Sequence, residues 1–140
     1  MPYARDIVRE QLLGHEGERL KPYRCTAGKL TIGVGRNIED RGISKEESRY
    51  LLANDIVAVE NQCWEKFQWF RGEHLNDARK AAVMNMVFNM GIEGFSKFRK
   101  TIAHLEAGRW AEAADEAMDS KWSKDVGRRA VEVTTAIREG

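Results

Sequence analysis

The chain has 140 residues, 42% of them hydrophobic, which is enough for one globular domain or for two small lobes that share a core. Its 23 Lys and Arg residues against 22 Asp and Glu residues give a formal net charge of +1, and this balance does not favour nucleic acid as a partner. No apolar run approaches the roughly 20 residues of a membrane span, and the charged first ten residues lack a signal-peptide core, so we expect synthesis in the cytoplasm.

The first predicted element is a helix over about residues 4–15. Val8 and Leu12 form an apolar row on one face of this helix. Glu16 continues the row, because residues four apart share a helix face. We therefore expect the Glu16 carboxyl to begin against a core and to point outward where the helix ends.

Residues 23–38 are predicted to form a β-hairpin, because small and apolar side chains alternate in the second half of this segment. A simple four-residue loop would pair Cys25 with Leu30 and leave Thr31 on the opposite face. Cys25 and Thr31 share a face only if the loop is odd or contains a bulge, for which Gly28 can supply the left-handed conformation. The face of the strand that carries Thr31 also carries Gly33 and Gly35, which have no side chains, so we expect the Thr31 hydroxyl to meet solvent or substrate.

Helical patterns account for most of the remaining chain. A capping box at Ser44 and Glu47 predicts the start of a long helix that extends to about Phe70. A third short strand is expected near 36–39, and further helices over about 77–90, 95–106, 109–119 and 123–138. This order predicts an α+β fold in which a long helix joins a small sheet-bearing lobe to a larger helical lobe.

The two cysteines do not make a disulfide framework in a chain of this length, and no histidine lies at zinc-binding spacing. Cys63 continues the apolar row of the long helix, which predicts a buried thiol that acts as a small hydrophobic side chain. The role of Cys25 stays open: it orients a water, acts as a nucleophile when ionised, or only fills space. Activation of Cys25 by His15, as in a cysteine hydrolase, is disfavoured because no third group completes that site.

The spacing of Glu16, Cys25 and Thr31, followed by Ile32-Gly33-Val34-Gly35, resembles the signature of the phage-type lysozymes of glycoside hydrolase family 24. In that family a glutamate is followed by an aspartate, or less often a cysteine, and then by a threonine. Later landmarks of the family recur here in the same order at 85–91, 109–114 and 121–129. The resemblance therefore spans nearly the whole chain.

The resemblance implies a lysozyme-like α+β fold. Its expected parts are a sheet-bearing lobe over about 16–43, a connecting helix over about 44–71, and a helical lobe made of about 1–15 and 72–140. It implies hydrolysis of the β-1,4 bond between N-acetylmuramic acid and N-acetylglucosamine in peptidoglycan. Glu16 would be the general acid, and Cys25 and Thr31 would position water or stabilise the transition state.

Further expectations follow from the same resemblance. Substrate-binding residues are implied at Gly35, Phe88, Asn89, Phe98 and Arg128. Arg128 should also lie near Glu16. No metal or organic cofactor is implied, and the protein is expected to act as a monomer. A separate holin-like membrane permeabiliser would let it reach the cell wall in the periplasm.

Two alternatives remain open at this point. Because Cys25 replaces the more usual aspartate, the chain could be a catalytically weak module that binds peptidoglycan without cutting it. A lytic transglycosylase is the other alternative, since it needs only the acid and lets the sugar close on itself to form an anhydro product.

Overall fold

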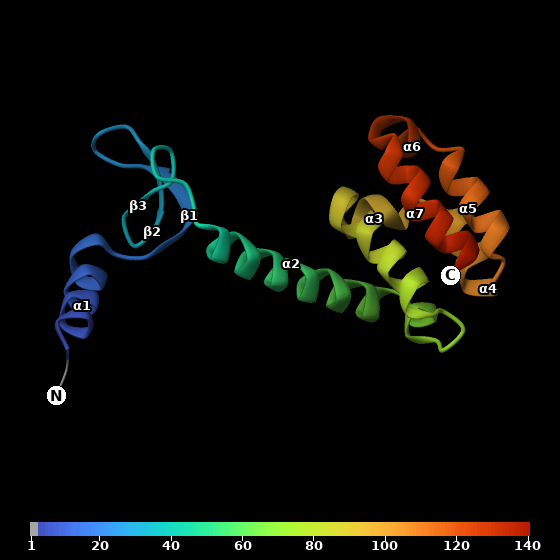
Figure 1. Ribbon diagram of the computed structural model, residues 1–140, viewed down its shortest axis with the longest axis horizontal. Helices are drawn as coiled ribbons and strands as arrows, with labels where there is room; N and C mark the ends of the chain where they lie inside the picture. The colour runs from blue at the N-terminus through green and yellow to red at the C-terminus, as the bar shows by residue number, and fades with distance from the viewer. Residues whose placement is uncertain (1–2) are drawn as a thin grey trace. The chain divides into compact units, whose positions relative to one another are not determined.

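The computed structural model describes residues 3–140 and confirms the predicted α+β class (Figure 1). The chain divides into two compact units, Met1–Tyr50 and Leu51–Gly140. The elements in chain order are α1 (Ala4–Glu16), β1 (Arg19–Arg24), β2 (Leu30–Gly33), β3 (Arg36–Asn37), α2 (Lys45–Lys66), the 3₁₀ helix η1 (Gln68–Arg71), α3 (Asp77–Ser96), α4 (Arg99–Ala107), α5 (Trp110–Met118), α6 (Lys121–Val126) and α7 (Arg128–Glu139). The assignment of residues 1–15 to the helical lobe stays a prediction.

The three strands form an antiparallel sheet in the order β1-β2-β3, so β2 is the central strand. Thr31 pairs with Tyr23 on β1 and with Asn37 on β3. It is only 3% exposed and is the one buried residue among residues 3–50. The expectation that its hydroxyl meets solvent is therefore wrong: Thr31 is buried on the central strand, and its hydroxyl donates to the Lys29 carbonyl over 2.8 Å.

The loop between β1 and β2 has an odd number of residues, which is one of the conditions under which Cys25 and Thr31 share a face. The Cys25 amide donates to the Lys29 carbonyl over 3.0 Å, and the Gly28 amide donates to the Cys25 carbonyl over 2.8 Å. Gly28 has a φ of 76° and is the left-handed residue that follows a type I turn in a hairpin with a loop of this kind. Because Thr31 lies opposite Tyr23, and side chains alternate along a strand, Cys25 shares the face of Thr31.

The start of α2 has the predicted capping box. The Ser44 amide donates to Glu47 Oε1 over 2.8 Å, and the Glu47 amide donates to Ser44 Oγ over 3.1 Å. Arg36 on β3 forms a bidentate (two-pronged) ion pair with the same carboxylate: Nη1 donates to Oε1 over 3.0 Å and Nη2 donates to Oε2 over 2.7 Å. The Arg36 guanidinium and the Ser44 donors lower the pKa of Glu47 to about 2. This pair ties the sheet to the first turn of α2.

Several helix boundaries differ from the predicted ones: the helix expected over 95–106 begins only at Arg99, and the helix expected over 123–138 is divided into α6 and α7 at Gly127, which has a φ of 56°. The long helix stops at Lys66 rather than near Phe70, because Phe67 adopts extended backbone (φ −120°, ψ 104°) and the chain continues as η1. The helix expected over 77–90 is interrupted at Gly91 (φ 80°, ψ 159°), as predicted, but helical structure resumes at once and α3 runs on to Ser96.

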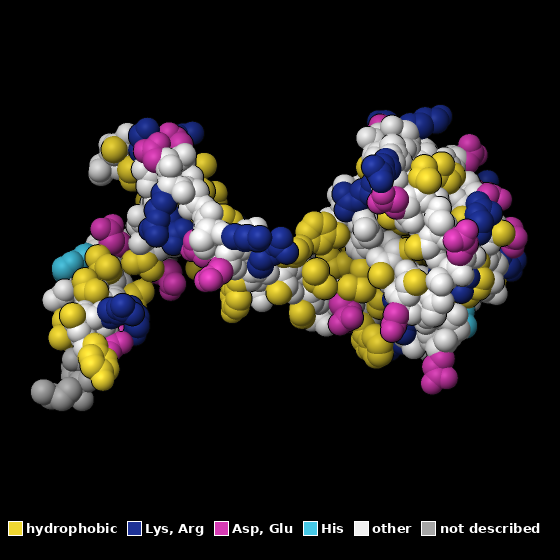
Figure 2. Space-filling model, in the orientation of Figure 1, with side chains coloured by type: hydrophobic (Ala, Val, Ile, Leu, Met, Phe, Trp, Pro, Cys, Tyr) yellow, Lys and Arg dark blue, Asp and Glu magenta, His cyan; other side chains and the backbone are white. Residues whose placement is uncertain are grey.

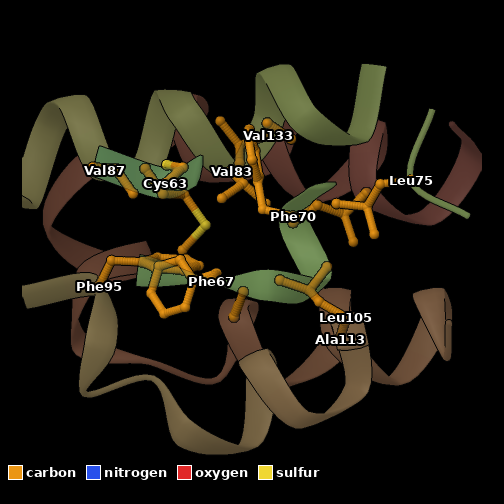
Figure 3. Close-up of a cluster of buried hydrophobic side chains, with 14 of the residues drawn as sticks. Cys63, Phe67, Phe70, Leu75, Val83, Val87, Phe95, Leu105, Ala113 and Val133 are labelled. Atoms are coloured by element: carbon orange, nitrogen blue, oxygen red, sulfur yellow. The ribbon is translucent and has the colours of Figure 1, made fainter. Parts of the chain in front are cut away.

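The hydrophobic core lies in the unit Leu51–Gly140 (Figure 3). Phe95 is fully buried, with its ring edge-on to Phe67 at 5.6 Å and stacked on Phe98 at 6.3 Å between centroids. Cys63 is also fully buried, as predicted, and burial raises the pKa of its thiol to about 11. The remaining core is built mainly from α3, α5 and α7, whose buried side chains include Val83, Met86, Ala113, Ala117, Val133 and Ile137.

The unit Met1–Tyr50 has no comparable core among its described residues. Helix α1 contains no buried residue, and hydrophobic side chains lie on its surface (Figure 2). Val8 and Leu12 are 44% and 43% exposed, so residues 3–50 do not bury this row by themselves, and its packing against the core of the helical lobe stays a prediction. Across residues 3–140, none of the helices combines the length and the apolar character that crossing a membrane requires.

The lowered pKa of Glu47 predicts an acid-dependent loss of stability. The unfolded chain protonates this carboxyl near its ordinary pKa of 4.5, whereas the folded protein keeps it ionised down to about pH 2. The stabilisation is therefore complete above about pH 4.5 and is lost as the pH falls toward 2. We expect Glu47→Gln to lower the free energy of unfolding at neutral pH, and the difference from wild type to shrink toward zero near pH 2. Urea denaturation followed by circular dichroism measures this difference.

The matched control for that experiment is Glu46→Gln, which changes an acidic residue in the same first turn of α2. Its effect should not follow the same pH course. A constant difference between wild type and Glu47→Gln from neutral pH to pH 2 would contradict the role given to the Arg36 pair.

The burial of Phe95 predicts a large loss of stability when its ring is removed. Phe95→Ala should cost about 3–5 kcal/mol, because it deletes an aromatic ring and leaves a cavity. Phe88→Ala on the same helix is the control, since Phe88 is 46% exposed and should cost much less. Equal thermal shifts for the two variants, measured by calorimetry, would count against the packing described.

Candidate active site

Glu16 is the last residue of α1, and Gly17 (φ 69°, ψ 172°) turns the chain away from the helix. Its side chain is exposed, so its carboxyl is free to meet a substrate. The carboxyl lies against the backbone of Gly35, where a Cβ atom placed on the glycine would be 3.0 Å from Glu16 Oε2. The fold thus brings the helix end and the segment after β2 together.

Cys25 lies at the start of the β1–β2 turn and is half-buried. The backbone amides of Lys29 and Ala27 lower the pKa of its thiol from the ordinary value, aided by the Thr31 hydroxyl, while partial burial opposes them. A larger share of Cys25 is therefore thiolate at a given pH than for a free cysteine. The thiolate is the form that accepts hydrogen bonds well.

The Thr31 hydroxyl has one proton to donate. It donates to the Lys29 carbonyl over 2.8 Å, yet the lowered pKa of Cys25 requires the same hydroxyl to donate to the thiolate. Both cannot hold at once. The hydroxyl therefore makes one of these two bonds at a time, and in the structure it makes the bond to Lys29.

Two of the predicted substrate-binding residues, Asn89 and Phe98, contact the same tryptophan in the second unit. Asn89 Oδ1 accepts a hydrogen bond from Trp122 Nε1 over 2.9 Å, and its own side chain stays exposed. Phe98 packs edge-on against the same Trp122 ring at 6.4 Å between centroids. Trp122 was not identified as a site residue from the sequence, because a tryptophan at helical spacing gives only a core signal.

Phe88 lines an open, mainly apolar groove of about 500 Å³ within Leu51–Gly140. The groove also contains a polar pair, in which Arg129 Nε donates a hydrogen bond to Asn85 Oδ1 over 2.8 Å. The other side chains that line it are Leu52, Ile56, Val59, Glu60, Asp77, Lys80, Ala81 and Met84.

Arg128 is 91% exposed and its Nε donates to Glu132 Oε1 over 3.0 Å, one helical turn further along α7. Such an exposed pair is weak and leaves most of the guanidinium open to other partners. The predicted proximity of Arg128 to Glu16 stays a prediction. Within residues 3–140 no group of three or more His, Cys, Asp or Glu side chains is gathered closely enough to hold a metal ion.

The structure therefore links the sequence-predicted residues in pairs. In the first unit, the Glu16 carboxyl lies beside Gly35, and Cys25 shares a face of the hairpin with Thr31. The first contact was not visible in the sequence, because nothing in the spacing of residues 16 and 35 signals that the two segments touch.

A family model and several known proteins match this chain over most of its length. Residues 14–138 match the family model described as phage lysozyme. The chain is 29% identical to probable T4-type lysozyme 2 of Dictyostelium discoideum, over 95% of this chain and 94% of that protein. It is 31% identical to the SAR-endolysin of Escherichia phage Mu, over 91% of this chain and 77% of that protein. It is 32% identical to the endolysin of Acyrthosiphon pisum secondary endosymbiont phage 1, over 79% of this chain and 73% of that protein.

The lowered pKa of Cys25 predicts its alkylation profile. Iodoacetamide reacts with thiolates, so labelling of native Cys25 should reach half its maximal rate at a lower pH than labelling of free cysteine. Cys63 should stay unlabelled until the protein unfolds, because it is fully buried. Thr31→Val should raise the midpoint for Cys25, whereas Thr26→Val in the same turn should not. Timed labelling with peptide mass spectrometry measures both thiols, and a midpoint equal to that of free cysteine would contradict the hydrogen bonds described.

Proposed function

Because the chain belongs to the phage lysozyme family, and so is a glycoside hydrolase that acts on peptidoglycan, we propose that it cuts the β-1,4 bond between N-acetylmuramic acid and N-acetylglucosamine. Glu16 acts as the general acid in this proposal, and Cys25 and Thr31 act on the water or the developing charge. The observation that carries it is the placement of an exposed helix-terminal carboxyl against the segment that follows β2, the strand that holds Thr31 beside Cys25.

The acid role follows from what the bond requires. The departing oxygen of a glycosidic bond needs a proton, because an alkoxide leaves poorly, and a carboxylic acid held next to that oxygen supplies it. Glu16 suits this role since its carboxyl is exposed at the end of α1 and is confined on one side by Gly35.

The opposite side of the reaction needs a group that orients water or stabilises positive charge on the sugar ring. The thiolate of Cys25 can do so as an acceptor, and its lowered pKa supports that role. Thr31 then serves Cys25 by donating its proton to the sulfur in the ionised state. In this proposal Thr31 acts from beneath the surface, consistent with its burial.

We also propose that the glycan chain contacts Gly35, Phe88, Asn89, Phe98 and Arg128. The exposed side chains of Phe88, Asn89 and Arg128 support this for three of them. Phe98 contributes its packing against Trp122, which holds Asn89 in place. The endolysins among the relatives support action on the cell wall. We further propose that the protein acts there as a monomer, after a separate, holin-like membrane permeabiliser has let it out of the cytoplasm.

Substitution of the acid tests the mechanism. Glu16→Gln should reduce the release of reducing ends from purified peptidoglycan about 10²–10⁴-fold, because the amide cannot donate the proton. Glu18→Gln, two residues away, is the matched control and should keep wild-type activity. Full activity of Glu16→Gln would refute the proposed mechanism.

Substitutions at Cys25 test the second group. Cys25→Asp should retain activity, since a carboxylate also accepts hydrogen bonds from water, and Cys25→Ser should lose part of it, since a serine hydroxyl does not ionise in this range. Mass spectrometry of the products separates the alternatives. A hydrated reducing end supports hydrolysis, an anhydro sugar indicates a lytic transglycosylase, and binding without cleavage indicates a glycan-binding module.

A further inference from the structure

The contact between Gly35 and Glu16 is unusual among the glycines of the first unit. A Cβ atom added to Gly35 would lie 3.0 Å from Oε2, 3.1 Å from Cδ and 3.3 Å from Cγ of Glu16. All three atoms belong to the carboxyl end of that side chain. At every other glycine in residues 3–50, an added Cβ would meet nothing within 4 Å. The Glu16 carboxyl therefore lies next to the space that a side chain at Gly35 would occupy.

Hydrogen bonds do not supply this confinement. None of the side-chain hydrogen bonds within residues 3–50 involves the Glu16 carboxyl. Glu16 also ends its helix, so no following helical turn packs beside it in α1. The backbone of Gly35 therefore limits where the carboxyl can turn on that side.

We infer that Gly35 is a positioning residue for the general acid, an inference that rests on the proposed function of Glu16. A Cβ at distances of 3.0–3.3 Å is tighter than an ordinary van der Waals contact, so one partner has to give by a few tenths of an ångström. The carboxyl is the end of a flexible side chain, so it moves before the backbone at Gly35 does. The fold then survives while the proton donor turns away from the place where the leaving oxygen lies.

This role differs from direct substrate binding, which the family resemblance implied for Gly35. A glycine that lets the glycan approach its backbone contributes to substrate affinity, and a Cβ there raises KM. A glycine that seats the acid contributes to the proton transfer itself, because general acid catalysis requires the donor within hydrogen-bond distance of the leaving oxygen. A Cβ there lowers kcat with KM little changed.

The test compares Gly35→Ala with Gly42→Ala on a defined, water-soluble peptidoglycan oligosaccharide. The two glycines have almost equal positive φ values, 67° and 66°, so alanine strains the backbone alike at both. Only at Gly35 does the new Cβ meet the carboxyl. We expect similar drops in Tm for the two variants and wild-type kinetics for Gly42→Ala. For Gly35→Ala we expect a kcat of about one tenth of the wild-type value or below, with KM unchanged within about twofold.

Two further variants sharpen the test. Gly35→Asn adds the same Cβ but tolerates positive φ better than alanine, so it keeps the test open if Gly35→Ala unfolds. In the Glu16→Gln background, Gly35→Ala should cause no further loss of residual activity, since a residue that acts only through the acid has nothing left to position.

The outcomes separate the two hypotheses. Full activity of Glu16→Gln rejects the proposed function and this inference together. An inactive Glu16→Gln beside an unaffected kcat in Gly35→Ala and Gly35→Asn rejects the positioning role alone. A raised KM with unchanged kcat, or an equal loss with and without Glu16, also overturns it.

Discussion

The register of the β1–β2 hairpin is the constraint on which the candidate site depends. Side chains alternate between the faces of a strand, so a turn shorter or longer by one residue would move Thr31 to the other face from Cys25. The left-handed conformation of Gly28 closes the odd turn between Cys25 and Lys29. That turn also aims the amides of Ala27 and Lys29 at the sulfur, so one backbone feature places the thiol and sets its ionisation.

The two cysteines show that environment rather than residue type decides thiol chemistry. Cys63 is enclosed by the core, where burial disfavours the anion and raises its pKa to about 11. Cys25 sits among backbone donors, which favour the anion and lower its pKa. The thiolate therefore forms more readily at Cys25 than at Cys63, and it is the form of a cysteine that accepts hydrogen bonds well.

Different interactions stabilise each of the two units. Buried aromatic and aliphatic side chains stabilise residues 51–140, with Phe95 and Phe67 in the centre. Residues 3–50 bury only Thr31, so strand pairing and polar contacts carry more of the order there. The two-pronged pair of Arg36 with Glu47 is the best formed of these contacts, and it connects the sheet to α2 through a carboxylate that also caps the helix.

The sequence by itself determined the α+β class, the capping box at Ser44 and Glu47 and the break at Gly91, because each depends on residues close together in the chain. It left the length of the β1–β2 loop open, and the structure shows the odd loop. The sequence also carried the family, through the spacing of Glu16, Cys25 and Thr31. Only the tertiary structure decided that Thr31 is buried and that Gly35 touches Glu16. Those facts depend on which strands and which helix end meet in space, and neither periodicity nor spacing encodes a contact between segments so far apart along the chain.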